Sequence, residues 1–131
     1  MPAWNDYKAQ SKSRGSLAFE LYAVRSVPAA DPMVLKENLP AHLAYQGEQE
    51  KKGVLFLAGP LSDETGEQME GNGLIIYRAA SLEEAREIAA NDPMHKSGAR
   101  TFTIRRWLVN EGSLSLSVKL SAQSANFGDD G

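Results

Sequence analysis

Cysteine is absent from the 131-residue chain, and histidine occurs only twice. The lack of cysteine excludes disulfides, thiolate nucleophiles and zinc sites with cysteine ligands. No apolar run approaches the roughly 20 residues of a membrane-spanning helix, and the first residues lack the apolar stretch of a secretory signal. Basic residues are not in excess, since 14 Lys and Arg stand against 17 Asp and Glu. We therefore expect a cytoplasmic protein that binds neither membranes nor nucleic acid.

The composition is that of a globular protein, with 42% hydrophobic and 24% charged residues. A chain of this length usually forms one domain with its own core. We expect a polar N-terminal arm or edge element over residues 1–16 and the main domain over residues 17–112. An extra C-terminal strand with a polar tail is expected over residues 113–131.

The hydrophobic pattern predicts an alternation of strands and helices. Residues 17–25, 74–77 and 101–109 have the composition of strands, and the continuous apolar run 54–58 is typical of a fully buried central strand. One helix is expected to begin near Leu39–Pro40, because proline is best tolerated in a first turn, and to end at Gly53. A second begins at Leu82, after the capping sequence that starts at Ser81, and ends at Asp92–Pro93.

The remaining segments are expected to be a loop, a strand and a tail. The glycine-containing stretch 61–73 is predicted to be a loop. Residues 114–120 alternate leucine and valine with polar residues, which predicts an amphipathic strand, and residues 121–131 are expected to be a frayed polar tail.

The order β-α-β-β-α-β is that of the α+β, ferredoxin-like split βαβ sandwich, an antiparallel sheet with two helices on one face. This arrangement leaves the other sheet face open. A second copy of the chain is the simplest cover, so we expect a homodimer, with strand 114–120 contributing to the interface.

His42 and Asp92 are the residues best suited to acid–base chemistry. His42 follows Leu35 and Leu39 at helical spacing and lies in the first turn of the predicted helix. Such a position favours a neutral imidazole, which can act as a general base. Asp92 ends a helix, where the helix dipole disfavours its charge, so it needs a partner. Both helices pack on one sheet face, which allows an Asp92–His42 pair. A core histidine and an Asx-Pro turn are the purely structural alternatives.

Other residues are candidates for binding a substrate rather than for catalysis. His95 and Ser97 follow Asp92 in the same loop, and the Gly59–Pro60 turn follows the apolar strand. Arg105 at a strand end would suit a carboxylate, although a surface ion pair is the commoner explanation for such an arginine. No metal-binding spacing or dinucleotide fingerprint is present, so neither metal nor cofactor is expected.

Several of these segments resemble the YCII-related (YciI-like) family. The resemblance rests on Leu-Pro-Ala-His-Leu-Ala-Tyr at residues 39–45, Ala-Gly-Pro at 58–60, Ser-Leu-Glu-Glu-Ala at 81–85 and Asp-Pro-Met-His-Lys-Ser-Gly at 92–98. It implies a dimeric α+β barrel and an active site built on a His–Asp pair, here His42 and Asp92. It also implies lyase or isomerase chemistry on small organic molecules, including dehydrochlorination of aromatic diols.

Three interpretations follow. The first is a small cofactor-independent enzyme that uses His42 and Asp92 on a small anionic or phenolic substrate. The second is a ligand-binding or regulatory module without turnover. The third is a buried pair with a structural role only. A solvent-reachable cleft next to the His42 ring would favour a catalytic pair, whereas a structural pair would be sealed.

Overall fold

The computed structural model describes residues 1–128 and divides the chain into two compact units. Residues 20–108 form the larger unit. The smaller unit combines residues 1–19 with the chain from residue 109 onward. Among the described residues, none of the helices has the length and apolar character needed to cross a membrane.

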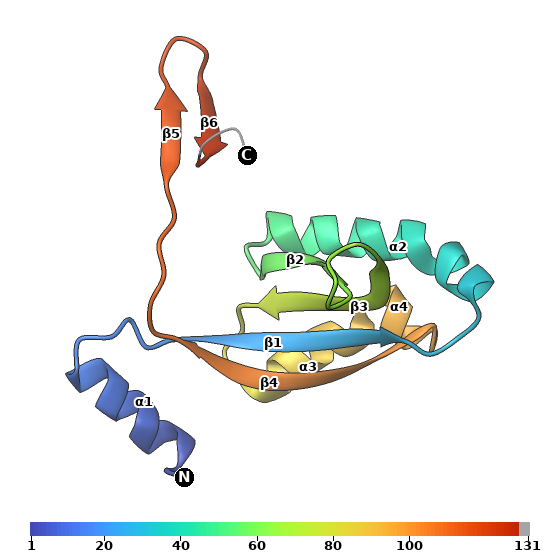
Figure 1. Cartoon of the computed structure of the whole chain (residues 1–131). Helices are drawn as coiled ribbons and strands as arrows, with labels where there is room; N and C mark the ends of the chain where they lie inside the picture. Colours follow the sequence, from blue (N-terminus) through green and yellow to red (C-terminus); the bar gives the residue numbers. More distant parts are fainter. Residues whose placement is uncertain (129–131) are drawn as a thin grey trace. The chain divides into compact units, whose positions relative to one another are not determined.

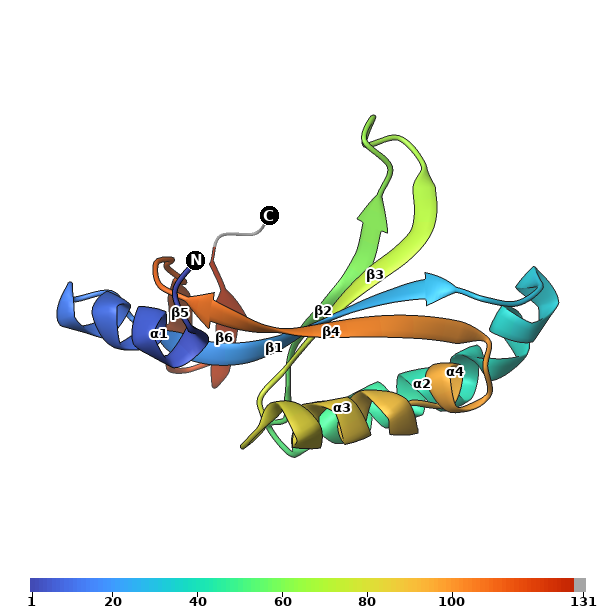
Figure 2. The same ribbon diagram turned by 90° about the horizontal axis from the view of Figure 1, so that it is seen from below.

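The larger unit is a four-stranded sheet with three helices on one face (Figures 1 and 2). Its strands follow the spatial order β2-β3-β1-β4, and β3 pairs antiparallel with both β1 and β2. This is the predicted α+β fold with its split βαβ order, which is thereby confirmed. Along the chain the elements are β1 (Phe19–Pro28), α2 (Pro32–Lys51), β2 (Leu55–Ser62), β3 (Met69–Tyr77), α3 (Leu82–Asn91), α4 (Pro93–Lys96) and β4 (Arg100–Val109).

The core lies between the sheet and the helices. Alternation along β1 turns Tyr22 and Val24 toward the helices, where they meet two buried alanines of α3. Small alanines let the helix approach the sheet closely. The buried cluster consists of Tyr22, Val24, Ile75, Tyr77, Ala85, Ala89 and Ile104. Ser26 continues the inward-facing series of β1 and is also buried, at 4% exposure.

Helix α3 begins where the capping sequence predicts. The Ser81 hydroxyl accepts a hydrogen bond from the Glu84 amide at 3.1 Å, and the Glu84 carboxylate accepts one from the Ala80 amide at 2.7 Å. These contacts satisfy amides that have no partner within the helix.

Helix α2 corrects the prediction that the main helix begins near Leu39–Pro40. It begins at Pro32, with Asp31 as the cap that accepts from the Met33 amide at 3.0 Å, and Pro40 lies inside the helix. The capped, proline-containing start at Asp31–Pro32 outweighs the loss of one backbone bond at Pro40. His42 therefore lies more than two turns from the helix start, so the first-turn environment predicted for it is wrong.

Strand β2 corrects a second prediction. The apolar run 54–58 was expected to be the fully buried central strand, but β2 is an edge strand and Leu57 is 55% exposed. One side of β2 packs on α2, which accounts for its apolar content without a central place in the sheet. The predicted loop 61–73 is also shorter, because β2 extends to Ser62 and β3 begins at Met69.

The smaller unit contains a helix and a β-hairpin. Helix α1 (Trp4–Ser13) occupies the segment expected to be an arm or edge element. Strand β5 (Leu116–Lys119) confirms the amphipathic strand in shorter form. It pairs with β6 (Ser124–Phe127), so the predicted frayed tail is wrong for residues 124–127. Residues 129–131 of that tail lie outside the described residues.

Candidate active site

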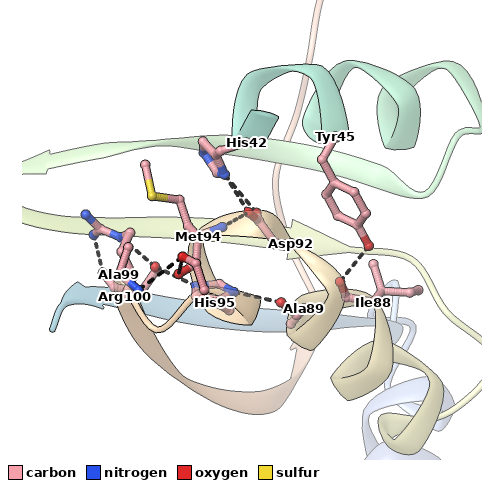
Figure 3. A network of polar contacts seen from close by, with 11 residues as sticks. His42, Tyr45, Ile88, Ala89, Asp92, Met94, His95, Ala99 and Arg100 are labelled. Atoms are coloured by element: carbon pink, nitrogen blue, oxygen red, sulfur yellow. Dashed lines mark hydrogen bonds and ion pairs between the residues drawn. The ribbon is translucent and has the colours of Figure 1, made fainter. Parts of the chain in front are cut away.

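An imidazole and a buried carboxylate meet between α2 and the end of α3 (Figure 3). His42 Nδ1 lies 2.8 Å from each carboxylate oxygen of Asp92. The Asp92 side chain is fully buried, whereas the His42 side chain remains 17% exposed. The structure therefore brings together the two residues that the sequence predicted as a pair.

The turn between α3 and α4 fixes the Asp92 carboxylate. Asp92 ends α3 and caps α4, whose first residue is Pro93. Its Oδ1 also accepts a hydrogen bond from the Met94 amide at 3.0 Å. The Asx-Pro turn and the His–Asp pair, considered as alternatives from the sequence, occur together. A buried carboxylate requires such partners, because desolvating an unpaired charge is costly.

The contacts assign the proton on the neutral His42 ring. An ionised carboxylate only accepts hydrogen bonds, so the nitrogen facing Asp92 carries the hydrogen. Nε2 is then the basic nitrogen, and it has no hydrogen-bond partner among residues 1–128. A basic Nε2 on a side chain that is 17% exposed and backed by a carboxylate is suited to proton transfer with a small molecule.

Two tyrosines lie close enough to Asp92 for its charge to affect them. The Tyr45 hydroxyl donates to the Ile88 carbonyl at 2.7 Å, and the Tyr77 hydroxyl is buried without a hydrogen-bond partner in the described part of the chain. Burial and, secondarily, the negative charge of Asp92 raise the pKa of both phenols. Both therefore stay protonated at neutral pH. They provide a neutral, largely apolar setting for the pair.

His95 has a different environment from the one predicted for a substrate-binding residue. Its Nδ1 lies 2.7 Å from the Ala89 carbonyl and its Nε2 lies 2.8 Å from the Ser26 hydroxyl. The ring also packs against Phe102, with centroids 4.7 Å apart. Burial, more than any other cause, lowers the pKa of His95. Both nitrogens are engaged within the protein, so neither is free for a ligand in this structure.

The other predicted binding residues do not contact the pair. The Ser97 hydroxyl donates to the Met94 carbonyl at 3.3 Å, at the end of α4. Gly59 and Pro60 lie within exposed strand β2, paired with β3. Arg105 is exposed on β4 and follows the core residue Ile104, so alternation directs it to the opposite sheet face. None of these contacts links the four residues to the His42–Asp92 pair, so their role in binding a substrate stays a prediction.

Sequence reasoning missed residues that surround the pair. Arg100 donates through Nε to the Ser26 hydroxyl at 2.8 Å, and its terminal nitrogen donates to the Ser26 and Gly71 carbonyls. Ser26 could have been found, because it is the polar member of an inward-facing apolar series. Arg100 and Tyr45 had no comparable signal.

Two grooves are described in residues 1–128. One, of about 450 Å³, is formed between α2 and β2, and the other, of about 280 Å³, lies at the β2–β3 tip. Neither lining includes His42 or Asp92. Among residues 1–128, no three histidine, aspartate or glutamate side chains converge as metal ligands would.

Together, the fold and the paired residues define a small α+β protein in which His42 lies against the buried carboxylate of Asp92. The YCII-related domain matches residues 19–108, most of the chain, and the chain belongs to this family. It is 35% identical over 76 residues to the uncharacterized protein YjpA of Bacillus subtilis strain 168, covering 58% of this chain and 82% of that protein.

A solved structure has a similar fold. It is 5-chloro-2-hydroxyhydroquinone dehydrochlorinase (TftG) of Burkholderia phenoliruptrix AC1100, in complex with 2,5-dihydroxybenzoquinone. The TM-score is 0.52 at 24% identity, and the alignment covers 66% of this chain and 92% of TftG.

Proposed function

We propose that this protein is an enzyme that moves protons on a small anionic or phenolic molecule, in a lyase or isomerase reaction. The observation that carries the proposal is the pairing of partly exposed His42 with fully buried Asp92 at 2.8 Å. A sealed structural pair would leave no nitrogen accessible. Here the ring edge that carries Nε2 has no protein partner within the described chain.

His42 would act as the general base. Nε2 takes a proton from a carbon or hydroxyl of the substrate, and Asp92 stabilises the imidazolium that forms. In a lyase reaction, the released C–H electron pair forms a double bond while a leaving group on the next carbon departs with its own pair. In an isomerase reaction, the imidazolium returns the proton to a different carbon. Positioned acid–base catalysis contributes typically about 10²–10⁴-fold.

The fold likeness supports the choice of substrate class. TftG is a 5-chloro-2-hydroxyhydroquinone dehydrochlorinase, and its structure is a complex with 2,5-dihydroxybenzoquinone. Because the similarity to TftG is one of fold, we choose phenols and hydroxyquinones only as the first compounds to test.

We also propose that the protein works as a homodimer. The sheet face opposite the helices carries apolar side chains with large exposed areas, among them Leu74 at 37% and Trp107 at 44%. A second copy would remove this surface from water. Light scattering of the purified chain should give twice the mass of one chain, and a monomer at micromolar concentration would contradict this proposal.

The test is turnover of halogenated and plain dihydroxybenzenes and hydroxyquinones, with products identified by NMR and halide release measured. His42→Ala should lower the rate at least about 10²-fold while the far-ultraviolet circular dichroism is unchanged. Glu37→Ala, at an exposed position of the same helix, is the matched control and should retain the wild-type rate. Tight binding of a compound that remains intact would instead favour a ligand-binding module, and turnover independent of His42 would refute the proposal.

A further inference from the structure

A chain of side-chain hydrogen bonds connects the sheet to the turn that carries Asp92. It runs from Arg100 on β4 to Ser26 on β1, and from Ser26 to His95 on α4. His95 then reaches the Ala89 carbonyl at the end of α3. Figure 3 shows His95 and Arg100 on one side of Asp92 and His42 on the other. The mechanism proposed above does not use this chain of contacts.

The chemistry of the groups fixes the direction of two of the three bonds in the chain. A carbonyl only accepts, so His95 Nδ1 carries a hydrogen and donates to Ala89. A guanidinium only donates, so the Ser26 hydroxyl accepts from Arg100 Nε. When the His95 ring is neutral, its hydrogen is on Nδ1 and Nε2 is unprotonated, so the Ser26 hydroxyl donates to Nε2. The chain is complete with a neutral His95 ring.

His95 thereby holds the end of α3. The Ala89 carbonyl is one of the terminal carbonyls without a partner inside the helix, and the Asp92 amide reaches it only at 3.3 Å. His95 Nδ1 provides a closer donor, at 2.7 Å. The backbone of Asp92 lies between Ala89 and His95, and the carbonyl of Asp92 accepts from the His95 amide at 2.9 Å.

We propose that His95 is a positioning residue, whose bonds to Ala89 and Ser26 set the α3–α4 turn so that the Asp92 carboxylate faces His42. This inference rests on the proposed function of the His42–Asp92 pair. Asp92 reaches His42 from one side of the turn, and His95 anchors the other side to the sheet. Without His95, the turn would lose its side-chain link to the sheet and keep its backbone bonds, the Asp92–Met94 contact and the Tyr45–Ile88 bond.

A protonated His95 would reverse the bond to Ser26. The Ser26 oxygen would then accept from two cationic donors, Arg100 Nε and His95 Nε2–H, and the Ser26 hydrogen would lose His95 as its acceptor. Arg100 and His42 are the cationic or protonatable groups facing the ring, Asp92 is the acidic group, and Ser26 and Phe102 are the neutral neighbours. The positioning role therefore belongs to the neutral ring.

The test compares full-length variants by two readouts. His95→Phe keeps an aromatic ring but removes both bonds, His95→Asn keeps a donor for Ala89, and Lys96→Ala is an exposed control on α4. The first readout is the ¹⁵N shift pair of the His42 ring, which reports whether Nδ1 carries the hydrogen. The second is kcat and KM on a substrate found above.

His95→Phe should populate the other His42 tautomer and lower kcat about 10–100-fold with KM within twofold, because misplacing a catalytic group by about 1 Å costs up to about 10²-fold. His95→Asn should recover most of the loss, and Lys96→Ala should match the wild type. If His95→Phe does not fold, Ser26→Ala replaces it, with the same expected tautomer shift.

An unchanged His42 tautomer and kcat in His95→Phe, or in Ser26→Ala where that variant is used, would overturn the proposal. Failure of the proposed function is distinguishable. In that case no compound turns over in the wild type, but the tautomer readout still responds to His95.

Discussion

Replacing Asp92 by asparagine should disable the pair while nearly preserving its shape. In the wild type both carboxylate oxygens lie 2.8 Å from His42 Nδ1, and Oδ1 also accepts from the Met94 amide. Asparagine offers one oxygen, which the Met94 amide can occupy, and one NH₂ group. The NH₂ group donates, so His42 Nδ1 would have to accept and its hydrogen would move to Nε2.

The expected loss follows from this change of tautomer. Nε2 would no longer be basic, and the equivalent exchange in a serine protease lowers kcat about 10⁴-fold for the same reason. We expect kcat to fall about 10²–10⁴-fold. One imperfectly paired buried polar group should also lower the free energy of unfolding by about 1–3 kcal/mol.

The assay is kcat together with ¹⁵N NMR of the His42 ring, at a temperature where urea titration shows both proteins folded. Asp92→Glu, which keeps the charge, is the control for charge alone. Wild-type kcat in Asp92→Asn, or an Nδ1–H tautomer that persists in it, would refute the reasoning.

Three further predictions concern stability. Ser81→Ala should lower the free energy of unfolding by about 0.5–2 kcal/mol in urea titration, because it removes the α3 cap, and no change would contradict the capping assignment. Gly71→Ala should destabilise the folded protein, because the φ of Gly71 is +89° and a Cβ there would lie 2.9 Å from Pro28 Cγ. Gly47→Ala, in open space on α2, should stabilise it by about 0.5–1 kcal/mol. Equal melting temperatures of the two variants would refute this contrast. Because the pKa of His95 is lowered in the folded protein, the unfolded chain binds more protons. The free energy of unfolding of wild type relative to His95→Asn should therefore decrease as pH falls through about 6.5. A difference that stays constant with pH would contradict this prediction.

Local signals were sufficient for part of the fold. The capping sequence at Ser81 predicted the start of α3, because a cap depends only on residues within one turn. The order of elements predicted the sheet, since the split βαβ arrangement follows from it. Pro40 misled the prediction of α2, because a packed helix can retain an internal proline that an isolated segment would not. The edge position of β2 depends on the pairing partners of other strands, which an apolar run does not reveal.

The candidate site was predictable where it depended on helix faces. Helical spacing placed His42 and Asp92 on faces directed at one sheet, and the structure joins them. The environment of His95 was not predictable, because its partner Ser26 lies 69 residues away on strand β1. A loop position after an Asp-Pro pair suggested exposure to a ligand, and only the tertiary arrangement shows both ring nitrogens engaged.

The most direct test of the acid–base role is hydrogen exchange at carbon. Wild type and His42→Ala would be incubated with hydroxylated benzenes and hydroxyquinones in D₂O, and deuterium in the recovered compound measured by NMR. We predict that wild type catalyses deuterium exchange into at least one compound and that His42→Ala lowers that exchange rate at least about 10²-fold. Equal exchange by the two proteins would contradict a catalytic role for the His42–Asp92 pair.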